Sequence, residues 1–307
     1  MDRKYATTAC AGLTYLLTDT GRTALYGCQL CTQTDQMTGH VFTIAGGKGG
    51  VGKTTTAVNV GVAMQDAGYD VVIVDADLGM ANLAAMLEID YDTSLHEVLA
   101  ERAAISDTLT EGPGGVTLVP GEQSLEAFAD ADPAKLRKVI KTLSNAYDVV
   151  LIDTGAGLSH EATVPLGLAD SVLLVTTPDS VAIGDAGKTA QLAKRVDGEV
   201  IGAILTRAEA QEEIDEVERE VAHPLLAVIP EDSEATTNEP LVLNFPDSPA
   251  AEAYRRLATA LERILNGEPV DTIVEEETEW FPSGDEVDES EDDEDDSGGG
   301  VLGLFGG

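Results

Sequence analysis

An eight-residue glycine-rich segment, GKGGVGKT from Gly47 to Thr54, constrains the fold of this chain more than any other feature. It fits the pattern G-x-x-x-x-G-K-[ST] at every position, follows an apolar run over 41–45 and precedes a helical stretch over 54–67. Glycines let the backbone wrap so that successive N–H groups point at phosphate oxygens, and the following helix adds its positive N-terminal end. A strand, this loop and a helix in that order predict a phosphate-binding loop in an α/β domain.

Individual positions of this segment have expected tasks toward a nucleotide. The Lys53 ammonium is expected to neutralise charge on the β- and γ-phosphates, and the Thr54 hydroxyl to coordinate Mg²⁺. The residues expected to hold the nucleotide here are Gly47, Lys48, Gly49, Gly50, Val51, Gly52, Lys53, Thr54 and Thr55.

From residue 41 to about residue 266 the chain alternates strand-like and helical runs. The strand-like runs are 41–45, 71–75, 116–119, 149–153, 171–176, 200–205 and 225–229, and the helical runs include 54–67, 133–146, 180–196, 209–221 and 249–266. Continuous β-branched apolar runs are typical of parallel strands that are covered on both faces. The pattern predicts an α/β fold with a doubly wound, mostly parallel sheet and helices on both faces. A dehydrogenase is excluded, because the loop lacks G-x-G-x-x-G followed by an acidic ribose-binding residue.

A second lysine, Lys48, follows the first glycine of the loop. The run KGGVGKTT closely resembles the deviant Walker A motif of the MinD/ParA family, and the similarity extends over about residues 41–265. The resemblance implies a P-loop NTPase fold of the SIMIBI type, with ATP or ADP and Mg²⁺ as cofactors. It also implies slow, partner-stimulated hydrolysis of ATP and an ATP-dependent homodimer. In that dimer Lys48 reaches the partner's phosphates, as an arginine finger does in trans; the alternative is an ordinary solvated loop lysine.

An acidic segment follows the second predicted strand. Residues 75–83, DADLGMANL, are similar to the family's switch I. By that resemblance Asp77 orients the attacking water, and Asp77, Lys48 and Lys53 are the catalytic residues, while Asp75 and Asn82 support the switch. Carboxylates beyond the carboxyl ends of parallel strands face the ligand crevice. The alternative is that Asp75 and Asp77 only cap the next helix.

A second acidic segment, YDVVLIDTGAG over 147–157, resembles Walker B followed by switch II. Asp153 is expected to hold Mg²⁺ through water. Gly155 or Gly157 is expected to sense the γ-phosphate through its backbone N–H. Gly155 stands where the family usually has proline, which predicts a more flexible turn.

Two further stretches resemble the family's base-binding segments. Residues 228–232, VIPED, are similar to the stretch that cradles adenine in MinD, which makes Pro230 and Asp232 expected adenine contacts. Thr206 and Arg207 stand where the family often has Asn-Arg to read the base.

Composition divides the chain into three parts. Residues 1–36 are Thr-rich and nearly neutral, and are expected to be a loose appendage or, with translation from Met37, absent. Residues 37–266 form the predicted P-loop ATPase domain. Residues 267–307 are a predicted disordered acidic tail, with DEVDESEDDEDD over 285–296. Its apolar end, GGGVLGLFGG, is either unstructured or a short docking peptide.

The cysteines provide an alternative function. Cys10, Cys28 and Cys31 all lie in residues 1–36. With His40 or a ligand from a second chain they could bind metal, as in an iron–sulfur cluster assembly carrier. The other interpretation is that they are inert or not translated.

The formal net charge of −38, from 56 acidic against 18 basic residues, indicates a salt-adapted, haloarchaeal-type composition. In molar salt the Debye length is about 3 Å, so acidic self-repulsion is screened. The charge disfavours direct binding of duplex DNA, which a ParA-like partitioning ATPase, another alternative, requires. No apolar run reaches the roughly 20 residues of a membrane-spanning helix, and no basic residue follows Arg263 to form an amphipathic anchor.

Together these features predict a MinD-like ATPase that acts as an ATP-dependent dimerisation switch in the positioning of cell-division, motility or chemosensory assemblies. The expected partners are a second copy of the chain and an unidentified protein at the switch surface or the C-terminal tail. The expected location is the cytoplasm, peripheral to the membrane or polar through a partner.

Overall fold

The computed structural model describes residues 38–157, 160–208, 211–231 and 238–276 of the 307-residue chain. The chain divides into two units, Met1–Met37 and Thr38–Gly307, and every described residue belongs to the second. The predictions for residues 1–36, including the three cysteines, therefore lie outside the described residues.

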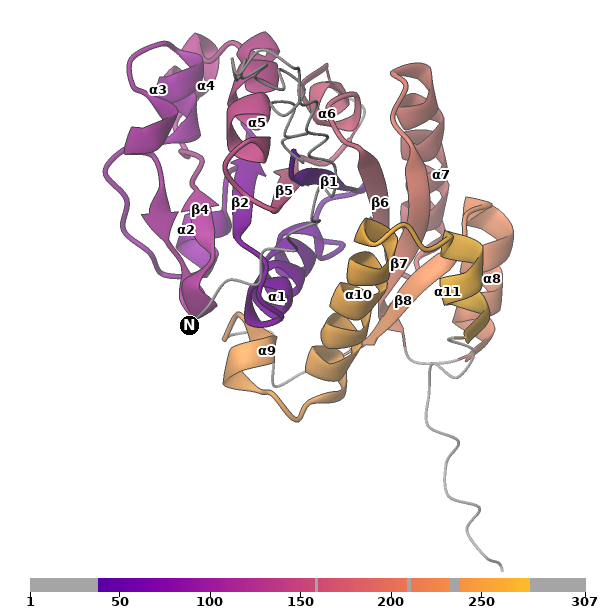
Figure 1. Ribbon diagram of the computed structural model, residues 1–307. Coiled ribbons are helices and arrows are strands. Elements are labelled where there is room, and N and C mark those ends of the chain that lie inside the picture. The colour runs from indigo at the N-terminus through magenta and orange to yellow at the C-terminus, as the bar shows by residue number, and fades with distance from the viewer. Residues whose placement is uncertain (1–37, 158–159, 209–210, 232–237, 277–307) are drawn as a thin grey trace, which may run out of the picture. The chain divides into compact units, whose positions relative to one another are not determined.

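The described part of the second unit is built on an eight-stranded sheet with the order β3-β4-β2-β5-β1-β6-β7-β8 (Figure 1). The strands are β1 His40–Ala45, β2 Val71–Ala76, β3 Thr110–Glu111, β4 Thr117–Val119, β5 Val149–Thr154, β6 Ser171–Thr176, β7 Val200–Ala208 and β8 Leu225–Pro230. The edge strand β3 runs antiparallel to β4, and all other pairs are parallel. The predicted doubly wound, mostly parallel sheet is confirmed.

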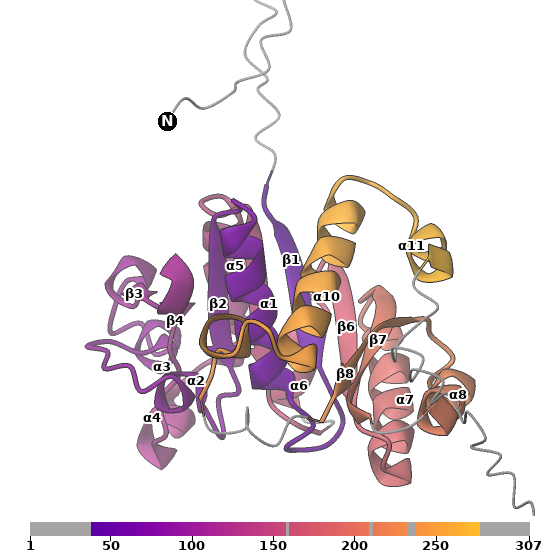
Figure 2. The same ribbon diagram turned by 90° about the horizontal axis from the view of Figure 1, so that it is seen from below.

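Helices cover both faces of this sheet. They are α1 Lys53–Asp66, α2 Leu83–Met86, α3 Leu95–Leu99, α4 Leu125–Asp130, α5 Leu136–Ser144, α6 His160–Leu166, α7 Ser180–Arg195, α8 Gln211–Val221, α9 Leu241–Asn244, α10 Pro249–Leu265 and α11 Val270–Glu276. Helices α1 and α10 lie side by side on one face, and α5, α7 and α8 pack on the other (Figures 1 and 2).

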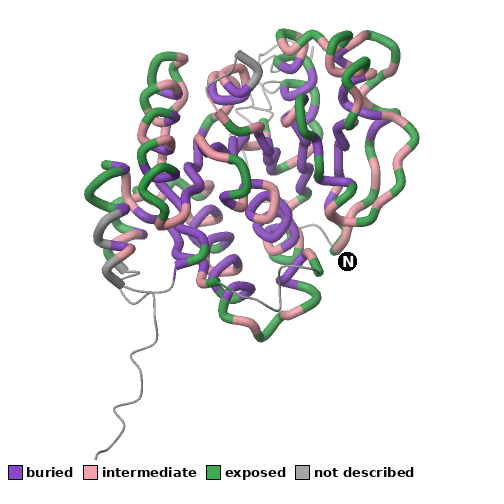
Figure 3. Tube along the Cα trace, turned by 180° about the vertical axis from the view of Figure 1, so that it is seen from behind, coloured by how far each residue is buried: buried purple, intermediate pink, exposed green. Residues whose placement is uncertain are grey.

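The core follows the alternation of side chains along the strands. In β1, Phe42 and Ile44 pack in the cluster that contains α1 and α10, whereas Val41 and Ala45 pack on the opposite side. The central strands β2, β5 and β6 are buried along their whole length, and the tube in Figure 3 shows this buried interior. Full burial of one such apolar side chain contributes about 1.5–3 kcal/mol. The buried residues of α1 hold this helix against the sheet, and they thereby fix the position of the glycine-rich loop at its start.

One helix lies beyond the predicted domain end at residue 266. It is α11, and its Ile273 is buried. The remainder of the predicted tail, 277–307, lies outside the described residues.

Candidate functional site

The glycine-rich loop joins the carboxyl end of β1 to α1, beside the carboxyl ends of β2 and β5 where ligands bind in such sheets. Gly50 (φ 76°) and Gly52 (φ 96°) have left-handed backbone conformations that favour glycine. At Gly47 a Cβ atom would lie 2.4 Å from the Cβ of Asp185, so no larger residue fits. No described side chain caps the N-terminus of α1, and its first turn has no acidic residue. The N–H groups of this turn therefore remain available to an anion.

Lys53 is buried among carboxylates. Its side chain is only 8% exposed. Burial lowers the pKa of Lys53, while the nearby carboxylates of Asp153 and Asp77 partly oppose that shift. The ammonium thus lies between the loop and the acidic ends of β2 and β5, where a phosphate group can share its charge.

Thr54 joins three elements through its hydroxyl. The Oγ1 atom lies 2.6 Å from Oδ2 of Asp153 at the end of β5 and 3.1 Å from Oδ1 of Asn82 ahead of α2. The other carboxylate oxygen of Asp153, Oδ1, is buried and has no hydrogen-bond partner among the described residues. Burial and the neighbouring Asp75 raise the pKa of Asp153 to about 8.

These oxygens suit a hard divalent cation. A hydroxyl and a carboxylate with an unused buried oxygen are ligands that Mg²⁺ prefers, and at nucleotide sites Mg²⁺ takes one or two protein oxygens together with phosphate oxygens and waters. In the described part of the chain, no group of three or more His, Cys, Asp and Glu side chains is placed to hold a metal by itself. The pair Thr54 and Asp153 therefore fits a metal that arrives with a phosphate ligand.

The segment after β2 is organised by Asp75, which is fully buried. Its carboxylate accepts hydrogen bonds from three backbone N–H groups, those of Asp77 (3.3 Å), Asn82 (3.0 Å) and Leu83 (3.0 Å). Burial raises its pKa to about 6. Asp75 thus contacts the start of α2, as a helix cap does, and at the same time holds the loop that carries Asp77.

Gly155 and Asp77 bring the two predicted switch segments into contact. A Cβ atom at Gly155 would lie 2.9 Å from Oδ1 of Asp77. Glycine in place of proline predicts a more flexible turn, and the structure adds a steric reason for it, since a side chain here would displace the Asp77 carboxylate. Gly157 has a left-handed conformation (φ 97°), and both glycines lie on the loop that follows β5.

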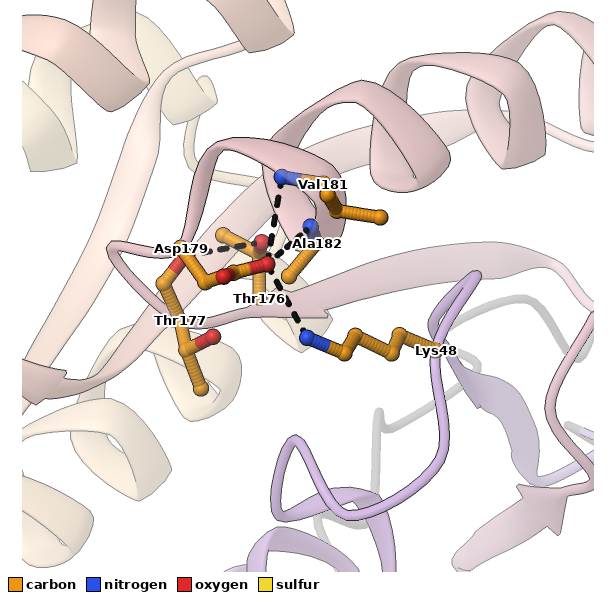
Figure 4. Close-up of polar contacts among 6 residues, drawn as sticks. All are labelled: Lys48, Thr176, Thr177, Asp179, Val181 and Ala182. Carbon is orange, nitrogen blue, oxygen red and sulfur yellow. Dashed lines mark hydrogen bonds and ion pairs between the residues drawn. The ribbon is translucent and has the colours of Figure 1, made fainter.

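Lys48 forms an exposed ion pair with the start of α7. Its Nζ lies 2.9 Å from Oδ1 of Asp179, the N-cap residue of α7, and both side chains are about half exposed (Figure 4). The same carboxylate oxygen accepts hydrogen bonds from the N–H groups of Val181 (3.1 Å) and Ala182 (3.0 Å). The hydrogen bond from Lys48 is the largest of several effects that lower the pKa of Asp179.

A cavity of about 720 Å³ opens beside the loop. Among the predicted site residues, its lining includes Gly49, Gly50, Gly52, Lys53, Thr54, Thr55, Asp77 and Arg207. Gly155, from the loop after β5, also lines it. Two large apolar side chains at this cavity, Met80 and Leu125, are 76% and 88% exposed. The cavity therefore combines polar groups of the glycine-rich loop with exposed apolar groups.

The four residues predicted to contact the base are placed differently from one another. Arg207 is exposed and lines the cavity. Thr206 is buried, and its hydroxyl lies 2.7 Å from the carbonyl oxygen of Val51 and 3.0 Å from that of Thr176, so it holds the glycine-rich loop against β6. Pro230 ends β8 and is not among the residues that line the cavity, and Asp232 lies outside the described residues.

Sequence reasoning did not single out Gln123, Ser124 and Leu125, which line the cavity from the segment that leads into α4 and from its first residue. The Nε2 atom of Gln123 donates a hydrogen bond to the carbonyl oxygen of Ala81. No motif marks these residues, because their place depends on the pairing of β4 with β2. No helix in the described part of the chain is long and apolar enough to cross a bilayer.

Comparison with known proteins agrees with this geometry. The family model described as the CobQ/CobB/MinD/ParA nucleotide binding domain matches residues 42–240. An uncharacterized ATP-binding protein of Methanocaldococcus jannaschii is 37% identical over 226 residues, which cover 71% of this chain and 86% of the relative. The cell division ATPase MinD of Pyrococcus furiosus has a similar structure, with a TM-score of 0.70 and 37% identity over 74% of this chain and 99% of that one.

The septum site-determining protein MinD of Pyrococcus horikoshii, solved in complex with Mg-ADP, gives a TM-score of 0.69 and 36% identity over 73% of this chain and 96% of that one. The family model covers more than half of the chain, and these relatives match nearly their full length. On this agreement of sequence, fold and loop geometry, the chain belongs to the CobQ/CobB/MinD/ParA family of nucleotide-binding domains.

Proposed function

We propose that this protein is a MinD-like ATPase that binds Mg-ATP, dimerises around it and is reset by slow, partner-stimulated hydrolysis. The observation that carries the proposal is the arrangement at the start of α1. An uncapped helix N-terminus, a buried lysine and a Thr54–Asp153 pair with one unused oxygen meet at the carboxyl edge of a parallel sheet. The Mg-ADP complex of the Pyrococcus horikoshii relative supports the choice of cofactor.

Binding is assigned to the loop and its neighbours. The N–H groups of the first turn of α1 and the Lys53 ammonium hold the phosphates, and Thr54 with Asp153 would hold Mg²⁺. The bound metal would neutralise charge that develops on the phosphates during transfer. Arg207, Pro230 and Asp232 remain proposed base contacts, while the hydroxyl of Thr206, which contacts the carbonyl oxygens of Val51 and Thr176, favours a role in supporting the loop.

Hydrolysis is assigned to the segments after β2 and β5. Asp77 lies at the cavity, close to Lys53 and against Gly155, where it can orient a water molecule toward the terminal phosphate. The N–H of Gly157 is proposed to report the γ-phosphate. Because Asp77 contacts the loop after β5, loss of the γ-phosphate would change the conformation of both segments together.

The biological role is proposed from the relatives. A cell division ATPase is among the similar structures, and the protein is proposed to position division, motility or chemosensory machinery through an unidentified protein partner. The acidic composition supports a salt-adapted cytoplasmic protein that reaches the membrane or pole through that partner.

Dimerisation should depend on both the nucleotide and Lys48. In high salt, we expect size-exclusion chromatography with light scattering to give a monomer with Mg-ADP and a dimer with Mg-ATP. Lys48→Ala should remain monomeric with Mg-ATP, because the lysine is proposed to contact the partner's phosphates. A dimer that forms regardless of nucleotide and of this substitution would contradict the switch.

The ion pair between Lys48 and Asp179 should oppose dimerisation. Asp179→Asn should lower the ATP concentration needed for half-maximal dimer by about two- to fivefold, an effect in the range of an exposed ion pair. Asparagine still caps a helix, so α7 should keep its N-terminus. The measurement is a light-scattering titration at the lowest salt that keeps the protein folded, since salt screens the pair.

A matched control is Glu252→Gln, which removes the exposed ion pair with Arg256 on α10. It should leave the dimer midpoint unchanged. If Asp179→Asn also leaves the midpoint unchanged, the ion pair between Lys48 and Asp179 does not measurably oppose dimerisation.

A further inference from the structure

His96 lies in α3, outside every motif that the sequence analysis used, and its side chain is only 1% exposed. Its ring nitrogens contact two backbone groups from different loops. Nε2 lies 2.9 Å from the carbonyl oxygen of Leu78, and Nδ1 lies 3.1 Å from the backbone nitrogen of Glu122. The imidazole therefore bridges the segment after β2 and the segment after β4.

The two contacts determine which nitrogen of the neutral imidazole carries the proton. A backbone N–H can only donate, so Nδ1 of His96 accepts from Glu122 and carries no proton. The remaining proton of a neutral imidazole is then on Nε2, which donates to the carbonyl oxygen of Leu78. Nε2 thus donates to the segment after β2, and Nδ1 accepts from the segment after β4.

The helix that carries His96 is firmly attached to the segment after β4. The N–H of Leu95 donates to the carbonyl oxygen of Pro120 at 2.7 Å, and the hydroxyl of Ser94 donates to Oε2 of Glu122 at 3.2 Å. Ser94 and Glu97 also form a capping box that fixes the first turn. The helix that carries His96 is therefore fixed to the segment after β4, and Nε2 of His96 can act as a fixed donor toward Leu78.

Leu78 directly follows Asp77, the residue proposed to orient the attacking water. We propose that His96 is a positioning residue: by holding the Leu78 carbonyl, it fixes the backbone on which Asp77 faces the cavity, and it ties that backbone to the cavity wall formed by Gln123, Ser124 and Leu125. This inference rests on the proposed hydrolysis of ATP. It adds a second attachment of the Asp77 loop, besides the three N–H groups that Asp75 holds.

Two substitutions separate the two tasks of the ring. In His96→Asn the side-chain oxygen can take the place of Nδ1 and accept from Glu122, while the donor to Leu78 is lost. In His96→Gln the side-chain amide can reach the place of Nε2 and donate to Leu78, while the acceptor for Glu122 is lost. If His96 positions Asp77, the asparagine variant should lose activity and the glutamine variant should largely keep it.

The experiment measures steady-state ATP hydrolysis, Mg-ATP affinity by calorimetry and thermal stability for the parent and both variants. We expect kcat to fall about tenfold or more in His96→Asn, since small misplacement of a reacting group has effects of this size. Affinity should stay within about twofold, and kcat of His96→Gln within about threefold. His40→Asn is the matched control: His40 begins β1, at the opposite end from the glycine-rich loop, and contacts Ser171.

The outcomes separate this inference from the function on which it rests. A parent protein that neither binds nor hydrolyses Mg-ATP overturns the proposed function. An active parent with equal kcat losses in His96→Asn and His96→Gln, or with none in either, overturns the positioning role. A fall in kcat for His40→Asn equal to that for His96→Asn does so as well, because it shows a general effect of losing a packed histidine.

Discussion

Replacing Lys53 with alanine is expected to weaken binding of Mg-ATP by about 10- to 100-fold. The ammonium is buried at the mouth of the cavity and has no neighbouring cation to replace it among the described lining residues except the exposed Arg207. A hydrogen bond between charged groups contributes about 1.5–3 kcal/mol, and each 1.4 kcal/mol corresponds to a tenfold change in affinity. Isothermal calorimetry with Mg-ATP in high salt measures the change directly.

The control for this prediction is Lys194→Ala, which removes an exposed lysine near the end of α7. It lowers the positive charge of the protein by the same amount and should leave affinity unchanged. Far-UV circular dichroism and thermal melts should show that Lys53→Ala is folded. Parent-like affinity in a folded Lys53→Ala protein would refute the assignment of the phosphate site.

Replacing Asp77 with asparagine should reduce ATP hydrolysis by about 100-fold or more while leaving Mg-ATP affinity within about threefold. A positioned acid–base group contributes about 10²- to 10⁴-fold to rate. Asparagine has nearly the same shape and can still accept the hydrogen bond that the Met80 N–H donates to Asp77 Oδ1. The local fold should therefore survive, and the loss should appear in kcat.

Single-turnover hydrolysis and calorimetry on the same preparations separate rate from affinity. Asp66→Asn, at the exposed C-terminal end of α1, is the matched carboxylate control and should hydrolyse ATP like the parent. If Asp77→Asn hydrolyses ATP at the parent rate, another group orients the water.

The sheet and the phosphate loop could be predicted because their signals are local. The seven apolar runs lie within a few residues of β1, β2 and β4 to β8, since continuous β-branched segments between turn residues have few alternatives to a buried parallel strand. The loop signal was equally local: the left-handed conformations of Gly50 and Gly52 require glycine at those positions. The sequence could not reveal the two-residue strand β3 or the short helices α2 to α4, whose length is too small for a periodic pattern.

The partners of the site residues could not be predicted, because they lie far apart in the chain. Lys48 pairs with Asp179, and Thr206 holds Val51, across sequence separations of 131 and 155 residues. Strand order decides such pairs, and a single sequence does not give strand order. His96 was overlooked for the same reason: one histidine in a short helix carries no motif, and its role depends on two loops that meet only after β2 and β4 pair.

The hydroxyl of Thr206 has a consequence for how binding energy is distributed. It contacts the carbonyl oxygens of Val51 and Thr176, and this restraint should reduce the conformational entropy that the glycine-rich loop loses on binding. Among the described residues, the hydroxyl of Thr54 links the phosphate-binding turn to Asn82 after β2 and to Asp153 in β5. The glycine-rich loop should thus bind ADP and ATP in the same conformation. The additional phosphate of ATP should act mainly on the segments around Asp77 and Gly157.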